Sequence, residues 1–290
     1  MSVTYAGILR RLAAERPRAP ALTYEDRTLS FADLHEMSSR TAQALRAAGV
    51  GRGDRVAMLS KNCIESFELM FACNKIGAIL AGINWRLSPR EIAAVLDDAR
   101  PTIVIAGTAE LPLLAEWQPA KGEFRGTIEL GEPFDRMRSS ASPEDTGYAG
   151  ADDDVAMLLF TSGTTGLPKG VMLTNAGMAF TPRLAGESWG MGPDSVNLVA
   201  MPMFHIGGCG YGSSTMTVGG HTVLLREVNP SQIIDIIARY RVTHTFLVPT
   251  VVHSMLHVPG VEKADLSSLE LLMYGAAPMG DVLLRQALSV

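Results

Sequence analysis

The chain has 290 residues, 47% of them hydrophobic and 19% charged, a balance typical of a globular protein and not of a disordered one. The formal net charge of −5 provides no basic surface for nucleic acid, and no apolar run is long enough to span a membrane. The three cysteines, Cys63, Cys73 and Cys209, have no metal-binding spacing and suit a reducing compartment, so we expect a cytoplasmic protein.

Strand and helix patterns alternate along the chain. A hairpin is predicted within residues 21–31, and further apolar, strand-like runs lie at residues 55–59, 77–83, 102–106, 127–130, 155–160, 170–173, 195–201, 243–248 and 269–274. Helical spacing and N-cap residues predict helices at residues 4–16, 30–48, 62–71, 111–117 and 230–240, with further helices that begin at residues 88 and 174. This alternation predicts an α/β fold with largely parallel sheets and flanking helices.

Four polar features have local structural interpretations. Ser88, Pro89 and Glu91 fit a capping box with proline at the first helical position. Residues 131–150 are polar and contain proline and glycine, which predicts a surface linker. In the aspartate triplet at 152–154, consecutive side chains cannot all face one ion, so we predict a solvated entry to the next strand and no metal site. Thr250 is predicted to cap the segment that follows the strand at 243–248.

The run FTSGTTGLPKGV at residues 160–171 follows a predicted strand and combines hydroxyl residues, glycines and one lysine. Glycines let backbone N–H groups approach a ligand closely, hydroxyls add donors, and Lys169 adds positive charge for phosphate oxygens. An ordinary polar turn would share part of this composition. A P-loop ATPase is disfavoured, because the Walker lysine follows a glycine whereas Lys169 follows Pro168. The run therefore predicts a triphosphate-binding loop.

At these residues the chain resembles the adenylate-forming superfamily, which includes acyl-CoA synthetases, firefly luciferase and the adenylation domains of peptide synthetases. Three other stretches are similar to motifs of the same synthetases: GAILAGINWRLSPREI at 77–92, PMFHIGG at 202–208 and GAAPMG at 275–280. The resemblance covers nearly the whole chain and implies the first part of an acyl-CoA synthetase, with a multilayer α/β domain. Such enzymes use ATP to convert a carboxylic acid to an acyl-adenylate, and then transfer the acyl group to coenzyme A.

The resemblance also implies roles for individual residues. The phosphates of ATP would be held by the loop residues Thr161, Ser162, Gly163, Thr164, Thr165 and Gly166. Lys169 would add charge, and Thr161 would share Mg²⁺ with a glutamate of the family's pattern. His205 would lie beside the acyl carbonyl, stabilising charge there and not acting as a general base; a structural histidine is the alternative. The adenylate would lie against Gly275, Ala276 and Ala277, and Val252 and His253 are candidates for lining the acyl pocket.

Four glycines follow His205, and the sequence leaves their purpose open. Gly207, Gly208, Gly210 and Gly212 would leave space either for close helix packing or for a ligand tunnel.

The chain ends at Val290 without the rest of the family's pattern: the glutamate for Mg²⁺, an aspartate for the ribose, and a C-terminal lid domain with the adenylation lysine. We interpret residues 1–150 as the first α/β part of the AMP-binding domain and residues 151–290 as its truncated phosphate-loop and acyl-pocket part. The chain alone is expected to be at best a weak nucleotide binder. An uncovered sheet edge predicts poor solubility or self-association as a homo-oligomer.

Two other functions remain open from the sequence. An adenylation domain could load a carrier protein instead of coenzyme A, although an amino-acid substrate would call for an acidic residue facing its ammonium group, and the pocket segments offer no convincing candidate. A non-catalytic nucleotide-binding remnant is the second alternative. Neither the acid nor its chain length follows from residue spacing.

Overall fold

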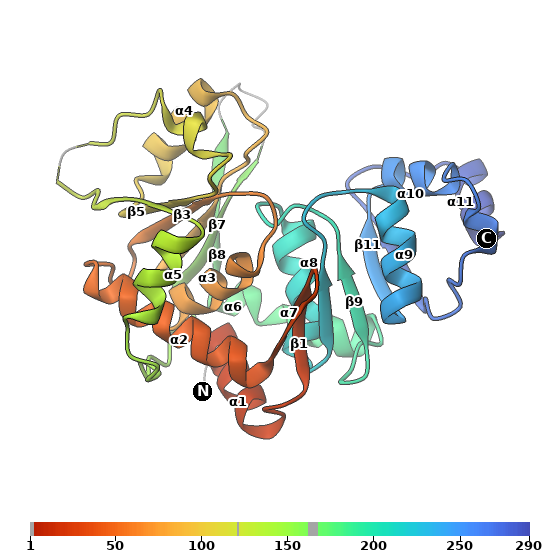
Figure 1. Ribbon diagram of the computed structural model, residues 1–290, viewed down its shortest axis with the longest axis horizontal. Helices are drawn as coiled ribbons and strands as arrows, with labels where there is room; N and C mark the ends of the chain where they lie inside the picture. The colour runs from red at the N-terminus through yellow and green to blue at the C-terminus, as the bar shows by residue number, and fades with distance from the viewer. Residues whose placement is uncertain (1–2, 121, 162–167) are drawn as a thin grey trace.

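The computed structural model describes residues 3–120, 122–161 and 168–290. The strands form two six-stranded sheets, which Figure 1 shows side by side. Sheet I has the order β6-β5-β3-β4-β7-β8, and its strands are β3 (Arg55–Leu59), β4 (Ile79–Gly82), β5 (Ile103–Ala106), β6 (Gly126–Glu129), β7 (Val155–Thr161) and β8 (Lys169–Thr174). Its strand pairs are parallel except β7 and β8, which are antiparallel.

Sheet II contains the later strands together with the first hairpin of the chain. Its order is β12-β11-β9-β10-β1-β2, and its strands are β1 (Pro20–Tyr24), β2 (Arg27–Ser30), β9 (Val196–Val199), β10 (His221–Leu224), β11 (His244–Leu247) and β12 (Leu271–Tyr274). Only the β1–β2 hairpin is antiparallel, as predicted for residues 21–31. The expected α/β fold with largely parallel sheets is confirmed. The division at residue 150 stays a prediction. The strands β7 and β8 follow residue 150 but belong to sheet I, and the strands β1 and β2 precede it but belong to sheet II.

Helices cover the faces of both sheets. They are α1 (Tyr5–Glu15), α2 (Phe31–Ala47), α3 (Ile64–Asn74), α4 (Pro89–Ala99), α5 (Glu132–Ser139), α6 (Asn175–Met178), α7 (Phe180–Arg183), α8 (Ile206–Thr217), α9 (Pro230–Tyr240), α10 (Pro249–Leu256) and α11 (Asp281–Leu288). Figure 1 shows α8 in the middle of the molecule and α9 to α11 on the outer side of sheet II. Within the described residues, no helix combines the length and the apolarity needed to cross a bilayer.

One apolar core joins the two sheets. It contains Met58 and Leu159 of sheet I, Val199 of sheet II, Phe67 of α3 and Cys209 of α8. A second cluster packs α9 and α10 against the outer face of sheet II, and a third packs α4 against the outer face of sheet I. The helix α8, which follows β9, and the helix α9, which follows β10, pack on opposite faces of sheet II. In open α/β sheets, ligands bind at the carboxyl ends of strands where such crossovers change direction, so the ends of β9 and β10 are where a site is expected.

The capping box predicted at residue 88 is present. The Ser88 hydroxyl accepts a hydrogen bond from the Glu91 backbone N–H at 3.4 Å, and the Glu91 carboxylate accepts one from the Ser88 backbone N–H at 2.8 Å. Pro89 occupies the first helical position of α4. The signature stretch at 77–92 therefore folds as the strand β4, a turn and a capped helix.

The surface linker predicted for residues 131–150 is wrong in its first half, where α5 forms. The helix has proline at its start, Glu132 and Asp135 in its first turn and basic residues in its last turn, which suits the helix dipole. Phe134 is fully buried, and Arg138 forms an ion pair with Glu68 of α3, whose side chain is also fully buried. Because only one residue of α5 is buried, its apolar face was too narrow to recognise in the sequence.

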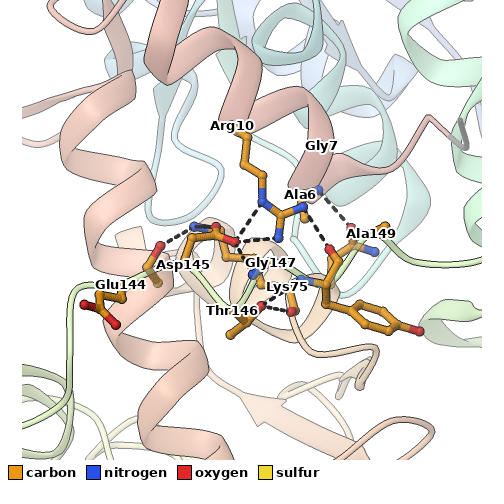
Figure 2. Close-up of polar contacts among 12 residues, drawn as sticks. Ala6, Gly7, Arg10, Lys75, Glu144, Asp145, Thr146, Gly147 and Ala149 are labelled. Carbon is orange, nitrogen blue, oxygen red and sulfur yellow. Dashed lines mark hydrogen bonds and ion pairs between the residues drawn. The ribbon is translucent and has the colours of Figure 1, made fainter.

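The second half of this segment is held by buried charges (Figure 2). We call Arg10, Lys75 and Asp145 the ion cluster. The Arg10 Nε donates to Asp145 Oδ1 at 2.9 Å, and the Lys75 Nζ lies 3.4 Å from Asp145 Oδ2. The Lys75 side chain is fully buried and also donates to the Ser39 hydroxyl at 2.7 Å, and the Thr146 hydroxyl donates to the Lys75 carbonyl. The ion cluster fixes residues 145–148 against α1, α2 and α3.

The solvated strand entry predicted for the aspartate triplet is wrong for its last residue. Asp152 and Asp153 are exposed, whereas Asp154 is only 8% exposed. The Asp154 carboxylate lies 2.6 Å from an Arg52 guanidinium nitrogen and accepts a hydrogen bond from the Ala151 backbone N–H. Its partner comes from a residue far away in the sequence, which no local pattern could indicate.

Two smaller predictions also need correction. Thr250 does not cap α10: Val248 is the N-cap residue, and Pro249 occupies the first helical position. The helix predicted at 111–117 is a short 3₁₀ segment at Leu111–Leu114.

Candidate active site

The strand pair β7 and β8 carries the ends of the predicted phosphate loop. Thr161 ends β7 and is paired in register with Lys169, the first residue of β8. The Thr161 hydroxyl donates to the Lys169 carbonyl at 3.5 Å, and both residues are exposed. Ser162, Gly163, Thr164, Thr165 and Gly166 lie outside the described residues. The antiparallel pair thus holds the loop's first hydroxyl and its lysine beside each other at the edge of sheet I.

His205 is the N-cap residue of α8, at the end of the turn that follows β9. This turn folds back tightly, because the His205 backbone N–H donates to the Pro202 carbonyl at 3.1 Å. A Cβ on Gly208 would lie 2.1 Å from the same carbonyl oxygen, so only glycine fits there. The turn therefore presents the His205 imidazole at the carboxyl end of a sheet II strand.

Asn62 holds this turn from the other side, and sequence reasoning missed its role. It was interpreted as the start of a helix, but Cys63 is the N-cap of α3. The Asn62 side chain is 3% exposed and donates to the carbonyls of Met201 and Leu225 at 3.0 Å each, while its oxygen accepts from the Met203 N–H at 2.9 Å. A buried amide with these partners joins the ends of two sheet II strands to α3. Only the three-dimensional structure reveals it.

The strand that leads into the phosphate loop and the histidine turn both contact β4. Gly82, the last residue of β4, is paired with Leu159 of β7, two residues before Thr161. A Cβ on Gly82 would lie 2.9 Å from the Cα of Phe204, so the backbone preceding His205 packs directly on β4. This contact brings the edge of sheet I that carries the phosphate loop next to the His205 end of sheet II.

The pKa of His205 is lowered, first by partial burial and then by the charge of Arg86. The Arg86 guanidinium lies 4.8 Å from the Trp85 ring centre and 6.0 Å from that of Phe204, which stacks on His205 at 4.5 Å. The imidazole is therefore predominantly neutral at neutral pH and can donate one hydrogen bond. This suits stabilisation of a carbonyl or carboxylate oxygen better than storage of a positive charge.

The 275–277 turn reaches the same region through Phe246 of β11. β11 and β12 are parallel, with Leu247 paired with Tyr274, and the turn follows directly. A Cβ on Gly275 would lie 3.0 Å from the Phe246 ring, and a Cβ on Gly207 would lie 2.9 Å from it. Phe246 thus links the turn to the first turn of α8. Ala276, which is exposed, has a φ of +66°, a left-handed conformation that costs about 1 kcal/mol for alanine.

The glycines that follow His205 serve close packing at two positions beyond this contact. Gly208 packs on the Pro202 carbonyl, and a Cβ on Gly212 would lie 2.9 Å from a methyl group of Val199. The packing interpretation is confirmed at these positions.

The two residues suggested for the acyl pocket both lie on α10, and their part in that pocket stays a prediction. Val252 is 3% exposed and belongs to the core cluster between α9, α10 and sheet II. It also lines a cavity of about 590 Å³ against β12 and α11. His253 is exposed on α10 and stacks on His257 with ring centres 4.3 Å apart. Val252 therefore belongs to the core around α9 and α10, and His253 to its surface.

The described residues include no group of three or more histidine, cysteine, aspartate or glutamate side chains arranged to hold a metal ion. Thr161 offers a single hydroxyl oxygen, whereas Mg²⁺ in nucleotide sites takes carboxylates together with phosphate oxygens. Thr161 alone therefore does not form a magnesium site, and its part in one stays a proposal.

The AMP-binding enzyme family model matches residues 9–290. The chain belongs to this family. ScoC of Streptomyces coeruleorubidus, a fatty acid–[acyl-carrier-protein] ligase, is 34% identical over 285 residues, which is 96% of this chain and 54% of that protein. A feruloyl-CoA synthase of an Amycolatopsis species is 34% identical over 270 residues, covering 93% of this chain and 53% of that protein. The chain spans about half the length of these relatives.

A solved structure has the same fold over almost the whole chain. The inhibitor-bound N-terminal domain of FACL13 from Mycobacterium tuberculosis is superimposed with a TM-score of 0.90 at 26% identity, covering 99% of this chain and 73% of that one. The predicted resemblance to the N-terminal part of an adenylate-forming enzyme is confirmed.

Proposed function

We propose that this chain provides the nucleotide- and acid-binding part of an acyl-CoA synthetase. In the first step, a carboxylate oxygen attacks the α-phosphorus of ATP, pyrophosphate leaves, and an acyl-adenylate forms. In the second step, the thiolate of coenzyme A attacks the acyl carbon and AMP leaves. The observation that carries the proposal is the meeting of the phosphate-loop strands, the His205 turn and the 275–277 turn around β4 and Phe246 in a member of the AMP-binding family.

Each segment has a part in the proposed first step. Thr161, the loop up to Gly166 and the Lys169 ammonium would hold the phosphates, and Thr161 would supply one ligand for Mg²⁺, which would offset the phosphate charge. The neutral His205 donates a hydrogen bond to the acyl oxygen as charge redistributes there. The turn at Gly275, Ala276 and Ala277 lies against the adenylate, where small side chains leave room for a flat ring.

A carrier protein is the second candidate for the acyl acceptor. ScoC, whose name assigns it an acyl-carrier-protein acceptor, is as similar to this chain as the feruloyl-CoA synthase is. The acceptor is identified by offering the adenylate to coenzyme A and to a phosphopantetheinylated carrier protein in separate reactions. A non-catalytic nucleotide-binding protein is the third candidate, and it would bind ATP without exchanging pyrophosphate with any acid.

The proposal includes a cytoplasmic location, which three free, buried cysteines support. The partners are small molecules: a carboxylic acid, ATP and coenzyme A, with no nucleic acid. Self-association as a homo-oligomer is also part of the proposal, and light scattering at several protein concentrations tests it.

The test uses protein at the size that it has in its source cells, established by blotting with an antibody against this region. A band well above 31.0 kDa identifies a longer polypeptide, which is then the form to assay. That protein is assayed for ATP–pyrophosphate exchange with a panel of organic acids.

His205→Ala is expected to lower the exchange rate about 100-fold, because one donor to a developing charge is lost. His257→Ala is the matched control, since His257 is an exposed histidine to which no part of the site is assigned. Equal rates for the two variants would contradict the role of His205, and absence of exchange with every acid would contradict the proposed function.

A further inference from the structure

The buried Tyr211 hydroxyl on α8 has no hydrogen-bond partner in the part of the chain that the structure describes. Tyr211 is 6% exposed, and no group among the described residues forms a hydrogen bond with its hydroxyl. A buried hydroxyl that lacks a partner is costly, so such groups call for an explanation in a native protein. Burial raises the pKa of Tyr211, so the phenol stays protonated and can both donate and accept.

Apolar side chains surround this hydroxyl-bearing ring. The ring centre of Tyr211 lies 5.5 Å from that of Trp189 and 5.5 Å from that of Phe246. The same cluster contains Ala185, Met191, Val218 and Met273. The indole N–H of Trp189 is the strongest hydrogen-bonding group in this cluster, and it forms no hydrogen bond with the phenol.

Tyr211 lies on the same helix as the candidate catalytic histidine. It follows His205 by six residues, which corresponds to about 9 Å along a helix axis. Gly207 and Tyr211 are four residues apart, so they share one face of α8, and both contact Phe246. One continuous wall therefore runs from the start of α8 past Phe246 to the Tyr211 hydroxyl.

A second unpartnered polar side chain faces the same helix. Asn197 on β9 is fully buried, and neither its amide nitrogen nor its oxygen has a partner among the described residues. Val199, two positions further along β9, packs on Gly212 of α8, so Asn197 points to the same side of sheet II. Its register partner His244 lies 2.9 Å, through Nε2, from the Trp189 carbonyl.

We propose that the acid activated at this site carries a hydroxyl, amino or carbonyl group at the far end of an apolar body, and that the Tyr211 hydroxyl binds that group. This inference rests on the proposed function. The rise from His205 to Tyr211 is about 9 Å along the helix axis, so with its carboxyl group at His205 an elongated acid would place its far end near Tyr211. The Phe246 ring packs against both Gly207 and Gly275, between the 275–277 turn and the first turn of α8.

A plain alkanoic acid fits this wall less well. Its methyl end would occupy the position next to the phenol and leave the hydroxyl without a partner in the complex. A site with a polar group for the substrate discriminates strongly against the analogue that lacks the matching group, because the protein's own group is then buried unpaired. The Tyr211 hydroxyl, and not the apolar surface that the acid buries, therefore decides which class of acid is preferred.

The experiment compares pairs of acids that differ only in one polar group. One pair is a 3-arylpropenoic acid with and without a para-hydroxyl, and the other is an alkanoic acid with and without a terminal hydroxyl. The kcat/KM for ATP–pyrophosphate exchange is measured for each acid with the protein at its native size. We expect a preference of about tenfold or more for the hydroxylated member of at least one pair, and Tyr211→Phe should abolish this preference.

The matched control is Tyr240→Phe, because the Tyr240 hydroxyl lies on α9 and donates to the Glu25 carbonyl. This variant should keep the preference of the unsubstituted protein. A preference that is absent, or that survives in Tyr211→Phe, overturns the inference while exchange itself still supports the proposed function. If no acid supports exchange, both the proposed function and this inference are wrong.

Binding of the acids gives a second readout that does not depend on catalysis. Trp189 lies next to Tyr211, so a bound acid should change its fluorescence, and Trp189→Phe should remove that change. The dissociation constant of the preferred acid should rise about tenfold in Tyr211→Phe, with little change for its unsubstituted partner. Equal effects on both acids would indicate a packing role for Tyr211 and contradict the inference.

Discussion

Buried polar groups have partners in one region of the molecule and lack them in another. Around α1, α2 and α3, the fully buried side chains of Glu68 and Lys75 each form ion pairs, and the buried Asp154 is paired with Arg52. Along the wall of α8, Asn197 and Tyr211 have no partner for their side chains among the described residues.

Two atoms of the ion cluster qualify this contrast without removing it. Arg10 Nη2 and Asp145 Oδ2 lack a hydrogen bond of ideal geometry. However, Arg10 Nη2 lies 2.7 Å from Asp145 Oδ1, and Asp145 Oδ2 lies 3.4 Å from the Lys75 ammonium. The two atoms are therefore compensated by opposite charges, which the hydroxyl of Tyr211 is not.

The contrast separates buried polar groups that stabilise the fold from buried polar groups that bind a ligand. A buried charge stabilises a fold only when its partners offset the cost of leaving water. A buried group that stabilises the fold therefore has its partners within the protein. A group that meets a ligand is complete only in the complex. Partnered groups around α1 to α3 should therefore affect stability, and unpartnered groups along α8 should affect ligand binding.

The largest effect on stability is expected for Arg138→Ala. The substitution leaves Glu68 buried without its cation, and breaking a buried ion pair costs about 3 kcal/mol. Arg136→Ala is the matched control on the same helix, because Arg136 pairs with Glu132 on the exposed surface. Urea unfolding at several pH values gives the free energy of unfolding for both variants.

The pH dependence sharpens this test. Burial raises the pKa of Glu68 to about 7, although the Arg138 guanidinium opposes the rise. The folded state therefore binds the Glu68 proton more tightly than the unfolded state does. The free energy of unfolding should fall as the pH rises toward and through about 7. In Arg138→Ala the ionised Glu68 carboxylate has no cation beside it. The decrease in the free energy of unfolding caused by the substitution should therefore be larger at about pH 8 than at about pH 6. A loss equal to that of Arg136→Ala at both pH values would refute the structural role.

A smaller effect is expected from the ion cluster in acid. Burial tends to raise the pKa of Asp145, but hydrogen bonds from Arg10 and the Gly147 N–H, with the charge of Lys75, lower it to about 2. Because the pKa of Asp145 in the folded state is below its ordinary value, the ionised carboxylate stabilises the folded state above about pH 4. This contribution to the free energy of unfolding is lost as the pH falls toward 2. Allowing for the partial exposure of Asp145, the loss is about 1–2 kcal/mol.

The measurement compares urea unfolding of the unsubstituted protein with that of Asp145→Asn between about pH 5 and pH 2. The variant should be less stable at the upper end of this range and should lose less stability on acidification. Asp26→Asn is the control, because the Asp26 side chain is 91% exposed in its pair with Arg239. Parallel curves for the unsubstituted protein and Asp145→Asn would show that the ion cluster does not stabilise the fold.

The sequence predicted the sheets well because their signal is local. Short apolar runs such as 55–59 and 155–160 appear as β3 and β7 with almost unchanged ends. The residues of the 77–92 stretch contained both the strand and the capping box of α4. These features depend on periodicity and on hydrogen bonds between neighbours in the sequence, which a single sequence displays directly.

Partners that lie far apart in the sequence could not be predicted. Asp154 became buried because Arg52 reaches it, and α5 is held because Arg138 meets Glu68. Asn62 was interpreted as a local helix start, although its side chain joins two sheet II strand ends. Tyr211 gave no signal at all, since a missing partner is visible only when every neighbour is known.

The smallest effect is expected at two residues with left-handed backbones, one at a helix end outside the site and one in the 275–277 turn. Arg100 ends α4 with a φ of +46°, and Ala276 in the 275–277 turn has a φ of +66°. Glycine adopts this conformation without strain, so Arg100→Gly and Ala276→Gly should each raise the free energy of unfolding by up to about 1 kcal/mol. Thermal unfolding of the two variants measures this gain.

The two substitutions should differ in their effect on pyrophosphate exchange. Strain at a helix end outside the site serves only to stop the helix, so Arg100→Gly should leave the rate unchanged. Strain in the 275–277 turn fixes the backbone that is proposed to lie against the adenylate, so relaxing it in Ala276→Gly should lower the rate despite the gain in stability. If Ala276→Gly gains stability and keeps full activity, the left-handed conformation of Ala276 serves only to form the turn. The difference between groups that stabilise the fold and groups that bind a ligand would then hold for buried side chains and not for the backbone.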